Sequence, residues 1–473
     1  MDPNTFTDEK ALEQFGYRQE LKRTLGYFSS FALSFSVISV TTGLFANYGN
    51  GLRIGGPAFI WTWLVVGAGQ FLVALVFARL AAEIPLSGYA YHWTRRLAGP
   101  QLAWWAGWLM IIQFLTGMPG VCYALANYLV PYLGLDPSNR NVILATIVIL
   151  GAIALINHFG ILLASWVNNV SVVTEILGTV VVGLLLLFVA LWRHTKPLGF
   201  LLTHPAQPGG LSYIGAFAFS SLMSAWTLTG FETAANLAEE THDPTRNVPR
   251  AIVRSELFSV VVGFLVLAGF TLTIYDSKAV MGDSTPLGLI MDHYFPPLVT
   301  HATMVMVFIS IFASALANLT TLTRMVWAMA RDGQLPASAW LARVSRHRIP
   351  AHALWSVTLF SIVFVMWAKL EVVITGIATL AGYLTYAVVL AATLRRKTLI
   401  EISGTPAPAE DQRTHPSRGL TIAALTWTLI LVAMLSLPHS AWTNSLSTLA
   451  AIVVGGLWYG RVHLTQKRPA SPH

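Results

Sequence analysis

The stretch SFSVISVTTGLF, residues 34–45, lies inside the first long apolar segment of the chain and decides the fold class. Five hydroxyl residues and Gly43 fall within its first ten positions. In hydrocarbon every backbone N–H and C=O needs a partner, so a broken helix is stable only where it lines a cavity. We therefore expect an unwound segment around Ser39–Gly43 whose free amides receive an anionic group such as a carboxylate. The alternative is a continuous helix whose hydroxyls bond back to its own carbonyls.

A second stretch of the same kind, SSLMSAWTLTGFET at residues 220–233, interrupts the sixth apolar segment and contains one acid, Glu232. Segments one and six are five apart, so a five-plus-five inverted repeat would make them equivalent. Interruptions in corresponding helices of two halves are the sequence feature that best indicates the binding site of a transporter.

The composition places the whole chain in a membrane. Of 473 residues, 55% are hydrophobic and 11% are charged, whereas about a quarter of the residues in soluble domains are charged. This excludes a soluble multi-domain protein, a disordered chain and a nucleic-acid-binding domain. The single cysteine, Cys122, cannot form an intramolecular disulfide, and we expect it to be a small buried residue. The sequence has no metal-ligand spacing, and we expect no secretory signal peptide, because residues 1–27 are polar and charged.

Twelve segments are long and apolar enough to cross a bilayer, which needs about 20 residues per span. They are residues 26–51, 56–80, 101–133, 141–158, 163–192, 211–238, 252–275, 298–328, 350–369, 371–394, 419–437 and 441–460. The expected fold class is therefore an all-α polytopic membrane protein. Most of the 29 Lys and Arg residues fall on the side of the N-terminus, which predicts that both termini are cytoplasmic. The opposite side receives Arg53, Arg140, Arg193, Lys196, Lys278 and Lys369.

The spans define the expected organisation of the chain. A cytoplasmic N-terminal tail occupies residues 1–25, and a flexible cytoplasmic linker rich in proline and charge occupies residues 396–418. The remaining parts are the first inverted repeat at 26–192, the second at 211–395, two peripheral helices at 419–461 and a cytoplasmic tail at 462–473. The natural turn between the last two spans is Pro438-His439-Ser440.

Four further motifs surround the two interruptions. Gly55-Gly56-Pro57-Ala58 opens the second span, residues 83–91 follow it, residues 230–250 link spans six and seven, and residues 324–336 end span eight. In this order the motifs resemble the amino acid–polyamine–organocation (APC) permease superfamily, nearest its amino acid/choline branch with GABA and choline permeases. The resemblance covers about residues 20–400. It implies ten core helices in two inverted five-helix repeats, two peripheral helices, and alternating access at a site between helices 1, 3, 6, 8 and 10.

The expected substrate-binding residues lie at the two interruptions and on the third span. They are Ser39, Thr41, Thr42, Gly43, Gln113, Trp226, Thr227, Thr229 and Gly230, with Thr116 beside Gln113. Thr41 stands at the first glycine of the family's Gly-x-Gly pattern, which is a departure from that pattern. The resemblance implies that Trp226 closes over the substrate, and its ring face suits an ammonium group. A core tryptophan is the alternative.

Among the acids inside the spans, Glu175 and Glu232 are expected to serve coupling or gating, since a charge inside a membrane is costly and usually functional. The resemblance implies that Glu232 links the central site to the inner gate; a structural acid is the alternative. For Glu175 we expect binding of a proton or a cationic amine, or else a structural pair with an Asn or His. Ser314 and Asn318, on one helix face with Thr321, are expected either to bind substrate or sodium or to bond between helices.

The expected function is secondary active transport of an amino acid or small amine, driven by protons or sodium, in the plasma or inner membrane. GABA, choline and polyamines are included, with a zwitterion favoured. An amino acid/amine exchanger and a nutrient sensor are the alternatives. No Walker motif or catalytic constellation is present, so neither an ATP pump nor an enzyme is expected. We expect no cofactor beyond coupled H+ or Na+, no metal site and no nucleic-acid partner; the lipid bilayer and the small solute are the expected partners.

Overall fold

The computed structural model describes residues 12–13, 15–204, 213–283, 285–367, 371–403, 416–437 and 442–466. These residues are mostly helical, and among them the one β-type pairing outside helices is an isolated bridge between Leu25 and Thr241. The all-α fold class is confirmed. Long apolar segments form helices because a helix satisfies all its backbone polar groups within one segment.

The first half of the chain holds five long segments, of which the first and the fifth are interrupted. Their helices are α2 (Tyr27–Ile38) with α3 (Val40–Gly55), α4 (Trp61–Glu83), α6 (Pro100–Tyr132), α7 (Asn139–His158), and α8 (Ile161–Glu175) with α9 (Val181–Arg193). The short elements are η1 (Pro57–Ile60), α5 (Tyr89–Ala98), the π-helical turn η2 (Ile176–Val180) and η3 (Leu198–Leu202).

The second half begins with a segment that is broken into short helices. These are α10 (Tyr213–Ser220), α11 (Leu222–Thr227) and α12 (Thr233–Asn236), followed by η4 (Ala238–Glu240). The remaining helices are α13 (Pro244–Leu272), α14 (Ser277–Gly282), α15 (Pro286–Tyr294), α16 (Pro297–Arg331), α17 (Ser338–Leu341), α18 (Ala351–Trp367), α19 (Glu371–Ser403), α21 (Arg418–Ser436) and α22 (Trp442–Gln466).

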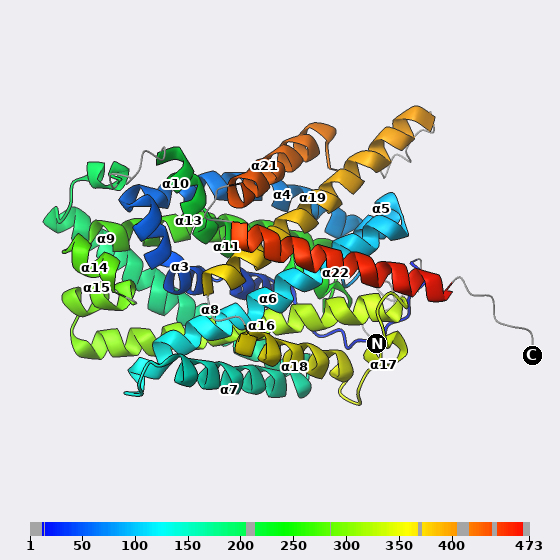
Figure 1. Ribbon diagram of the computed structural model, residues 1–473, viewed down its shortest axis with the longest axis horizontal. Coiled ribbons are helices and arrows are strands. Elements are labelled where there is room, and N and C mark those ends of the chain that lie inside the picture. Colours follow the sequence, from blue (N-terminus) through cyan, green and yellow to red (C-terminus); the bar gives the residue numbers. More distant parts are fainter. Residues whose placement is uncertain are drawn as a thin grey trace, which may run out of the picture.

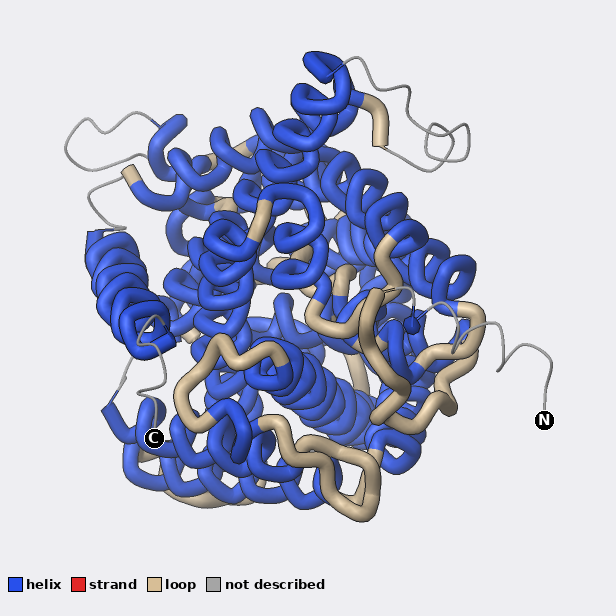
Figure 2. The backbone as a smooth tube through the Cα atoms, turned by 90° about the vertical axis from the view of Figure 1, so that its right-hand side faces the viewer, coloured by secondary structure: helices blue, strands red, loops and turns tan. Residues whose placement is uncertain are grey.

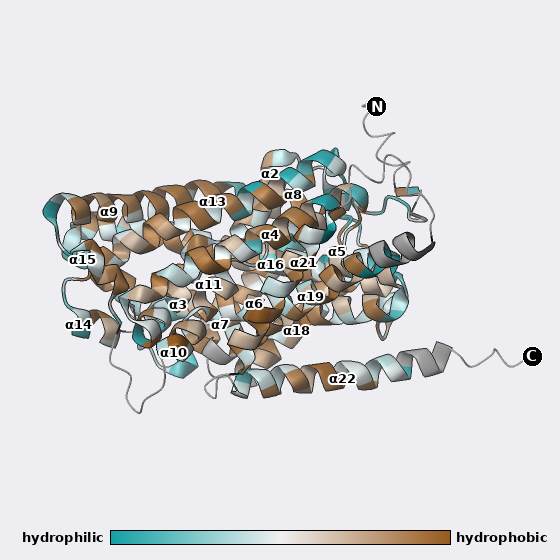
Figure 3. Cartoon of the chain, turned by 90° about the horizontal axis from the view of Figure 1, so that it is seen from above, coloured by the Kyte–Doolittle hydropathy of each residue, from teal (hydrophilic) through white to brown (hydrophobic). Residues whose placement is uncertain are grey.

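The helices agree with the twelve expected spans in place and in order. Nine helical stretches in the described part of the chain are long and apolar enough to cross a membrane. Three expected spans are missing from this set: the sixth is broken, Ala351–Met366 in the ninth is shorter, and α22 in the twelfth is not among the nine. The expected cut near residue 160 lies between α7 and α8. Apolar residues spread along outer helices such as α9 and α13, and hydrophilic ones gather at the two ends (Figure 3), which is the pattern of a membrane-spanning bundle.

The two broken spans lie against each other in opposite directions. α3 contacts α10 and α11, whereas α2 contacts α12, so the second half of one span meets the first half of the other. This arrangement is the one that an inverted repeat produces. The long helices α6, α16 and α19 pack against each other or against these breaks and complete the centre of the bundle (Figure 1).

The bundle has two distinct ends. α5, α17 and the end of α22 lie at one end, which we call the N-terminal end, and α14 and α15 lie at the other (Figure 1). Seen from the N-terminal end, loops lie across part of the bundle (Figure 2). The segment 15–26 is not a loose tail there, because Leu21 and Leu25 are fully buried against the helices.

Two expected boundaries can be compared with the helices. α19 runs to Ser403, beyond residue 395 where the second repeat was expected to end, so the linker begins later than expected. The expected turn Pro438-His439-Ser440 and most of the linker lie outside the described residues. Cys122 is a buried free cysteine, as expected.

Candidate functional site

The break in the first span is confined to one residue. α2 ends at Ile38 and α3 begins at Val40, and Ser39 between them has φ +31° and ψ +93°. The sequence predicted an unwound segment over Ser39–Gly43, and this is corrected: Thr41, Thr42 and Gly43 form the first turn of α3. Val40, Thr41 and Thr42 are β-branched and have modest helix propensity. α3 nevertheless begins directly after Ser39, because its first turn is capped.

A carboxyl group of the chain itself caps this helix. Thr41 N donates to Glu175 Oε1 at 3.0 Å, and the Ser39 hydroxyl lies 3.4 Å from both carboxylate oxygens. Glu175 is fully buried and directly precedes the π-helical turn η2, a distortion that is frequent at functional sites. An anion at a helix N-terminus is stabilised by the exposed N–H groups and the helix dipole.

The other amides of the first turn also have partners within the chain. Thr42 N donates to Ser39 Oγ at 3.1 Å, and Gly43 N donates to the Ser39 carbonyl at 3.0 Å. The expectation of free amides that await a substrate carboxylate is therefore wrong for this state. The alternative of an Asn or His partner for Glu175 is also not observed, since its hydrogen-bond partners are the backbone and hydroxyls at the break.

The break in the sixth span is longer. Between α11 and α12, residues 228–232 leave the helix, and Gly230 has φ +100°, which only glycine adopts without strain. Glu232 is fully buried, and its Oε2 accepts from Gly230 N at 3.1 Å. Its Oε1 accepts from the Tyr89 hydroxyl at 3.2 Å. Glu232 thus joins the broken helix to the start of α5 at the N-terminal end.

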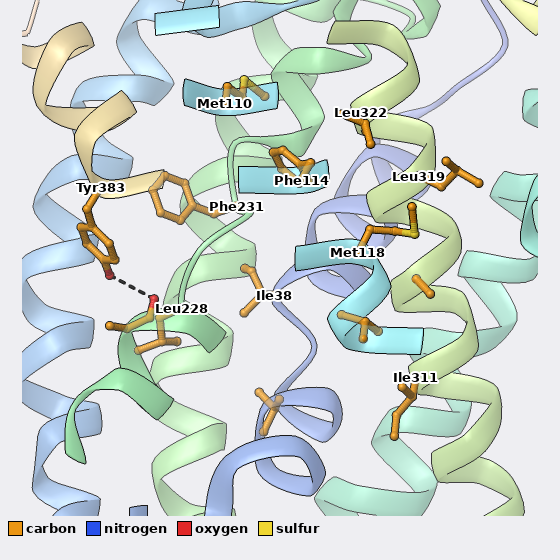
Figure 4. Close-up of a cluster of buried hydrophobic side chains, with 14 of the residues drawn as sticks. Ile38, Met110, Phe114, Met118, Leu228, Phe231, Ile311, Leu319, Leu322 and Tyr383 are labelled. Carbon is orange, nitrogen blue, oxygen red and sulfur yellow. Dashed lines mark hydrogen bonds between the residues drawn. The ribbon is translucent and has the colours of Figure 1, made fainter. Parts of the chain in front are cut away.

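A cavity with about 430 Å³ of empty space, part of it open to solvent, lies between the two breaks. Six predicted residues line it: Thr42, Gln113, Trp226, Thr227, Thr229 and Asn318. The remaining lining residues are Val37, Ile38, Phe114, Gly117, Val121 and Ala378. Ile38 and Phe114 belong to the buried apolar cluster that also includes Phe231 and Met118 (Figure 4). The lining contains no charged side chain.

The other predicted residues lie outside the cavity lining. Ser39, Thr41 and Glu175 form the cap just described, and Gly230 and Glu232 form the break in the sixth span. Ser314 is buried, and its hydroxyl has no hydrogen-bond partner among the described residues, while its carbonyl accepts from Asn318 Nδ2 at 2.8 Å. Thr116 and Thr321 bond back to carbonyls of their own helices.

Gly43 allows the two breaks to approach each other. A Cβ at this position would overlap the Thr227 side chain, which lines the cavity. We predict that Gly43→Ala destabilises the folded protein by about 1–3 kcal/mol through overpacking and reduces uptake, because it pushes the two breaks apart. Solute uptake into proteoliposomes measures this effect.

Gly151→Ala is the matched control, because nothing lies within 4 Å of a Cβ there. Alanine is the better helix former at both positions, so helix propensity cannot account for a loss. Equal uptake by the two variants would contradict the importance of this close approach.

A network of ion pairs closes the N-terminal end. Arg324 Nε lies 2.8 Å from Glu240 Oε1, with both side chains buried, and Arg331 Nη2 lies 3.1 Å from Glu239 Oε1. The Glu240 carbonyl accepts from Leu25 N at 2.9 Å, so η4 also holds the N-terminal segment. Asp332 pairs with Arg95 and accepts from the Tyr17 and Tyr91 hydroxyls. The sequence indicated only that residues 230–250 link spans six and seven, and this network was not predicted.

His92 of α5 is buried under this network, and its Nε2 has no hydrogen-bond partner among the described residues. Burial holds its pKa well below the usual 6.5, and the charges of Arg331 and Arg95 act in the same direction. Burial beside Asp332 likewise raises the pKa of Tyr17 to about 12. Both groups are therefore neutral at pH 7.

This burial predicts a pH dependence of stability. When the protein unfolds below pH 6.5, His92 binds a proton that the folded state rejects. The stability it contributes is therefore present above pH 6.5 and is lost as the pH falls below it, with a slope of at most about 1.4 kcal/mol per pH unit. Thermal unfolding on both sides of pH 6.5 should show a smaller acid-induced drop for His92→Gln than for the wild type. Equal drops would contradict the prediction.

A second cavity lies between α3 and the start of the sixth span. Asn47, Asn50, Gly51, Ile54, Phe219, Ser220, Leu222 and Met223 line it. The lining residues of α3 follow the break at Ser39, and those of α10 and α11 precede the break at residues 228–232. This cavity therefore lies on the side of the breaks away from the N-terminal network. The ion-pair network thus lies at one end of the bundle, and this cavity lies toward the other.

The sequence of this chain is similar to those of known permeases. The sequence profile described as amino acid permease matches residues 25–458. Amino-acid permease BAT1 of Arabidopsis thaliana is 29% identical, with 90% of this chain and 88% of the relative covered. Amino-acid permease 2 of Neurospora crassa is also 29% identical, with 76% and 69% covered.

A solved structure has the same fold at low identity. It is a Na+-coupled sialic acid symporter in a substrate-bound outward-open state, with a TM-score of 0.52, 13% identity, and 95% of this chain and 97% of that chain covered. The predicted resemblance to permeases is confirmed by the profile match over most of the sequence. The chain belongs to the amino acid permease family, so it is a secondary transporter and not an enzyme.

Proposed function

We propose that this permease takes up a zwitterionic amino acid, with GABA included in that class, by alternating access driven by a proton gradient. The cavity between the two breaks is the substrate site. The protein lies in the plasma or inner membrane with both termini in the cytoplasm.

The observation that carries this proposal is the uncharged lining of the cavity. Hydroxyl and amide groups of Thr42, Gln113, Thr227, Thr229 and Asn318 offer hydrogen bonds, and Trp226 offers an aromatic face. A zwitterion carries no net charge, so such a lining suits it, whereas a polyamine or choline needs an opposing charge or several aromatic faces. Glu175 and Glu232 lie outside the lining, which disfavours a cationic solute.

The coupling of substrate to gate runs through the broken sixth span. Trp226 lines the cavity. Six residues later, Glu232 accepts hydrogen bonds from Gly230 N and from the Tyr89 hydroxyl. Closure of Trp226 over a solute would shift the residues between them and strain the Glu232 contacts. Glu232 is therefore the gating carboxylate, and Glu175 is the fixed anion that shapes the first break. Ser314 and Asn318 support the cavity from α16.

The orientation follows from the Lys and Arg distribution, since the basic residues of the network, of α5 and of residues 342–350 after α17 gather at the N-terminal end. A state that is closed there and hollow at the opposite end would be open to the outside. The basic residues at that end also agree with a cytoplasmic location of the termini.

The test is uptake into proteoliposomes with an imposed inward proton gradient and a panel of amino acids, GABA, choline and putrescine. We expect a zwitterion to accumulate and a protonophore to abolish the accumulation. Uptake only into vesicles preloaded with amino acid would instead indicate an exchanger, and accumulation of choline or putrescine would overturn the substrate class. Trp226→Ala should weaken substrate affinity, and Glu232→Gln should lower the uptake rate, because an amide cannot accept from both Gly230 N and the Tyr89 hydroxyl as the carboxylate does.

A further inference from the structure

A third acid inside the bundle, Glu256 on α13, has no role in the site described so far. Its side chain is fully buried, and neither carboxylate oxygen has a hydrogen-bond partner among the described residues. It lines neither of the two cavities. An ionised carboxylate without a partner costs several kcal/mol in a membrane interior, so a purely structural explanation is weak.

The packing of α13 against α4 shows what faces Glu256. Trp63 Nε1 of α4 donates to the Val260 carbonyl at 3.0 Å, and a Cβ on Gly263 would overlap the Trp63 ring. One turn further along α4, a Cβ on Gly67 would meet the Val260 side chain. The helices therefore run antiparallel, one turn of α4 matching one turn of α13. The next turn brings Gln70 to the level of Glu256.

Gln70 connects this level to the break in the sixth span. Its Nε2 donates to the Leu228 carbonyl at 2.8 Å, at the point where α11 ends. This contact fixes the amide orientation, because a carbonyl must face the NH2 group and not the oxygen. Gln70 Oε1 is therefore turned away from the break, and it is buried without a partner among the described residues. Two acceptor groups at one level that both lack a donor could both be satisfied by one shared proton.

The charges around Glu256 favour the same conclusion. Glu232 lies close enough to act electrostatically on Glu256, and the Tyr383 side chain interacts with both acids while its hydroxyl donates to the Ala225 carbonyl (Figure 4). From α4, the register places the neutral Gln70 at this level. From α2, Phe35 packs against Phe258, two residues from Glu256. Within the described residues, no cation is among the groups found to act on Glu256.

We propose that Glu256 is a proton-binding site of this transporter and that Gln70 transmits its protonation to the broken sixth span. In the state described, the Glu256 carboxyl keeps its proton and donates it in a hydrogen bond toward Gln70 Oε1, while Gln70 Nε2 holds the Leu228 carbonyl. When the N-terminal end opens, the proton leaves for water on that side. Gln70 Nε2 then turns to the carboxylate and releases Leu228, which frees the sixth span to move. A proton fits this dry position because it needs no shell of ligands.

The proposal rests on proton-driven uptake and specifies where the proton binds. The first test compares Glu256→Gln with the wild type in proteoliposomes, with Asp292→Asn as a matched carboxyl-to-amide control at an exposed position. We expect Glu256→Gln to lose proton-driven accumulation down to the level of empty vesicles while it keeps exchange with preloaded solute. The control should behave as the wild type. Wild-type accumulation by Glu256→Gln, or an equal response to a sodium gradient alone, would overturn the proposal.

A second readout works without transport. Infrared difference spectra between acidic and alkaline pH should contain the carbonyl stretch of a buried protonated carboxyl that is absent in Glu256→Gln and shifted in Glu256→Asp. This readout decides the case if Glu256→Gln does not fold, and absence of a shifted band in Glu256→Asp overturns the proposal. If the wild type accumulates no solute on a proton gradient, the proposed function fails, whereas the infrared band still decides whether Glu256 binds a proton.

Discussion

Arg324→Ala should destabilise the protein by about 3–5 kcal/mol, because it leaves the Glu240 carboxylate buried without its partner. Arg324 binds Glu240 through two contacts, Nε to Oε1 at 2.8 Å and Nη2 to Oε2 at 3.2 Å, and neither side chain is more than 1% exposed. Such a loss is a large part of the 5–15 kcal/mol that typically holds a folded protein together. Thermal unfolding of the purified variant measures it.

The same substitution should release the N-terminal segment. The Glu240 carbonyl accepts from the amides of Thr24 and Leu25, so displacement of η4 removes the main backbone anchors of that segment. Trypsin should then cleave after Lys22 faster than in the wild type, and solute uptake should fall because the N-terminal end no longer closes.

Two variants separate this prediction from a general effect of losing an arginine. Arg246→Ala removes a pair with Asp243 in which both side chains are exposed, at 73% and 45%, and an exposed pair contributes about 0–1 kcal/mol. Arg324→Met combined with Glu240→Leu removes both buried charges, so it should recover much of the stability that the single variant loses. A loss in Arg324→Ala no larger than in Arg246→Ala would contradict the prediction.

The positions of the two breaks could be predicted from sequence because their cause is local. Hydroxyls and a glycine in the middle of an apolar segment are incompatible with a plain lipid-facing helix, and both interruptions lie where this pattern placed them. The predicted length of the first break was too large, because a distant residue caps the helix that follows it. Glu175 is 134 positions from the Thr41 amide that it caps. No periodicity within either segment indicates that pairing.

The contacts that the sequence did not reveal also join residues that lie far apart in the chain. The Tyr89 hydroxyl meets Glu232 across 143 positions, and Arg331 meets Glu239 across 92. Glu256 did have a local signal, since it is the one acid within the expected span 252–275. It lies near the start of that span, where acids at helix ends are common, and the register of α4 and α13 is what places it opposite Gln70.

Glu175→Ala should abolish uptake and lower stability by several kcal/mol. The substitution leaves Thr41 N buried without its acceptor at the first turn of α3, and an unsatisfied buried donor costs about 1–3 kcal/mol, more where the lost partner is charged. A cavity forms in addition where the side chain was removed. Without its cap the first turn of α3 should unwind, which displaces Thr42 and Gly43 from the cavity and from Thr227.

Glu175→Gln separates the cap from the charge. The amide oxygen of Gln still accepts from Thr41 N, so the break keeps its shape, but the attraction between an anion and the helix N-terminus, about 0.3–2 kcal/mol, is lost. We therefore expect an order of stability and of substrate affinity in which the wild type exceeds Glu175→Gln and Glu175→Gln exceeds Glu175→Ala. Thr174→Ala is the neighbouring control, since the Thr174 hydroxyl bonds to its own helix and to Ser310 away from the break. Equal substrate affinity in Glu175→Ala and the wild type would show that α3 keeps its first turn without the cap. The close approach of Gly43 and Thr227 alone would then have to hold the site in place.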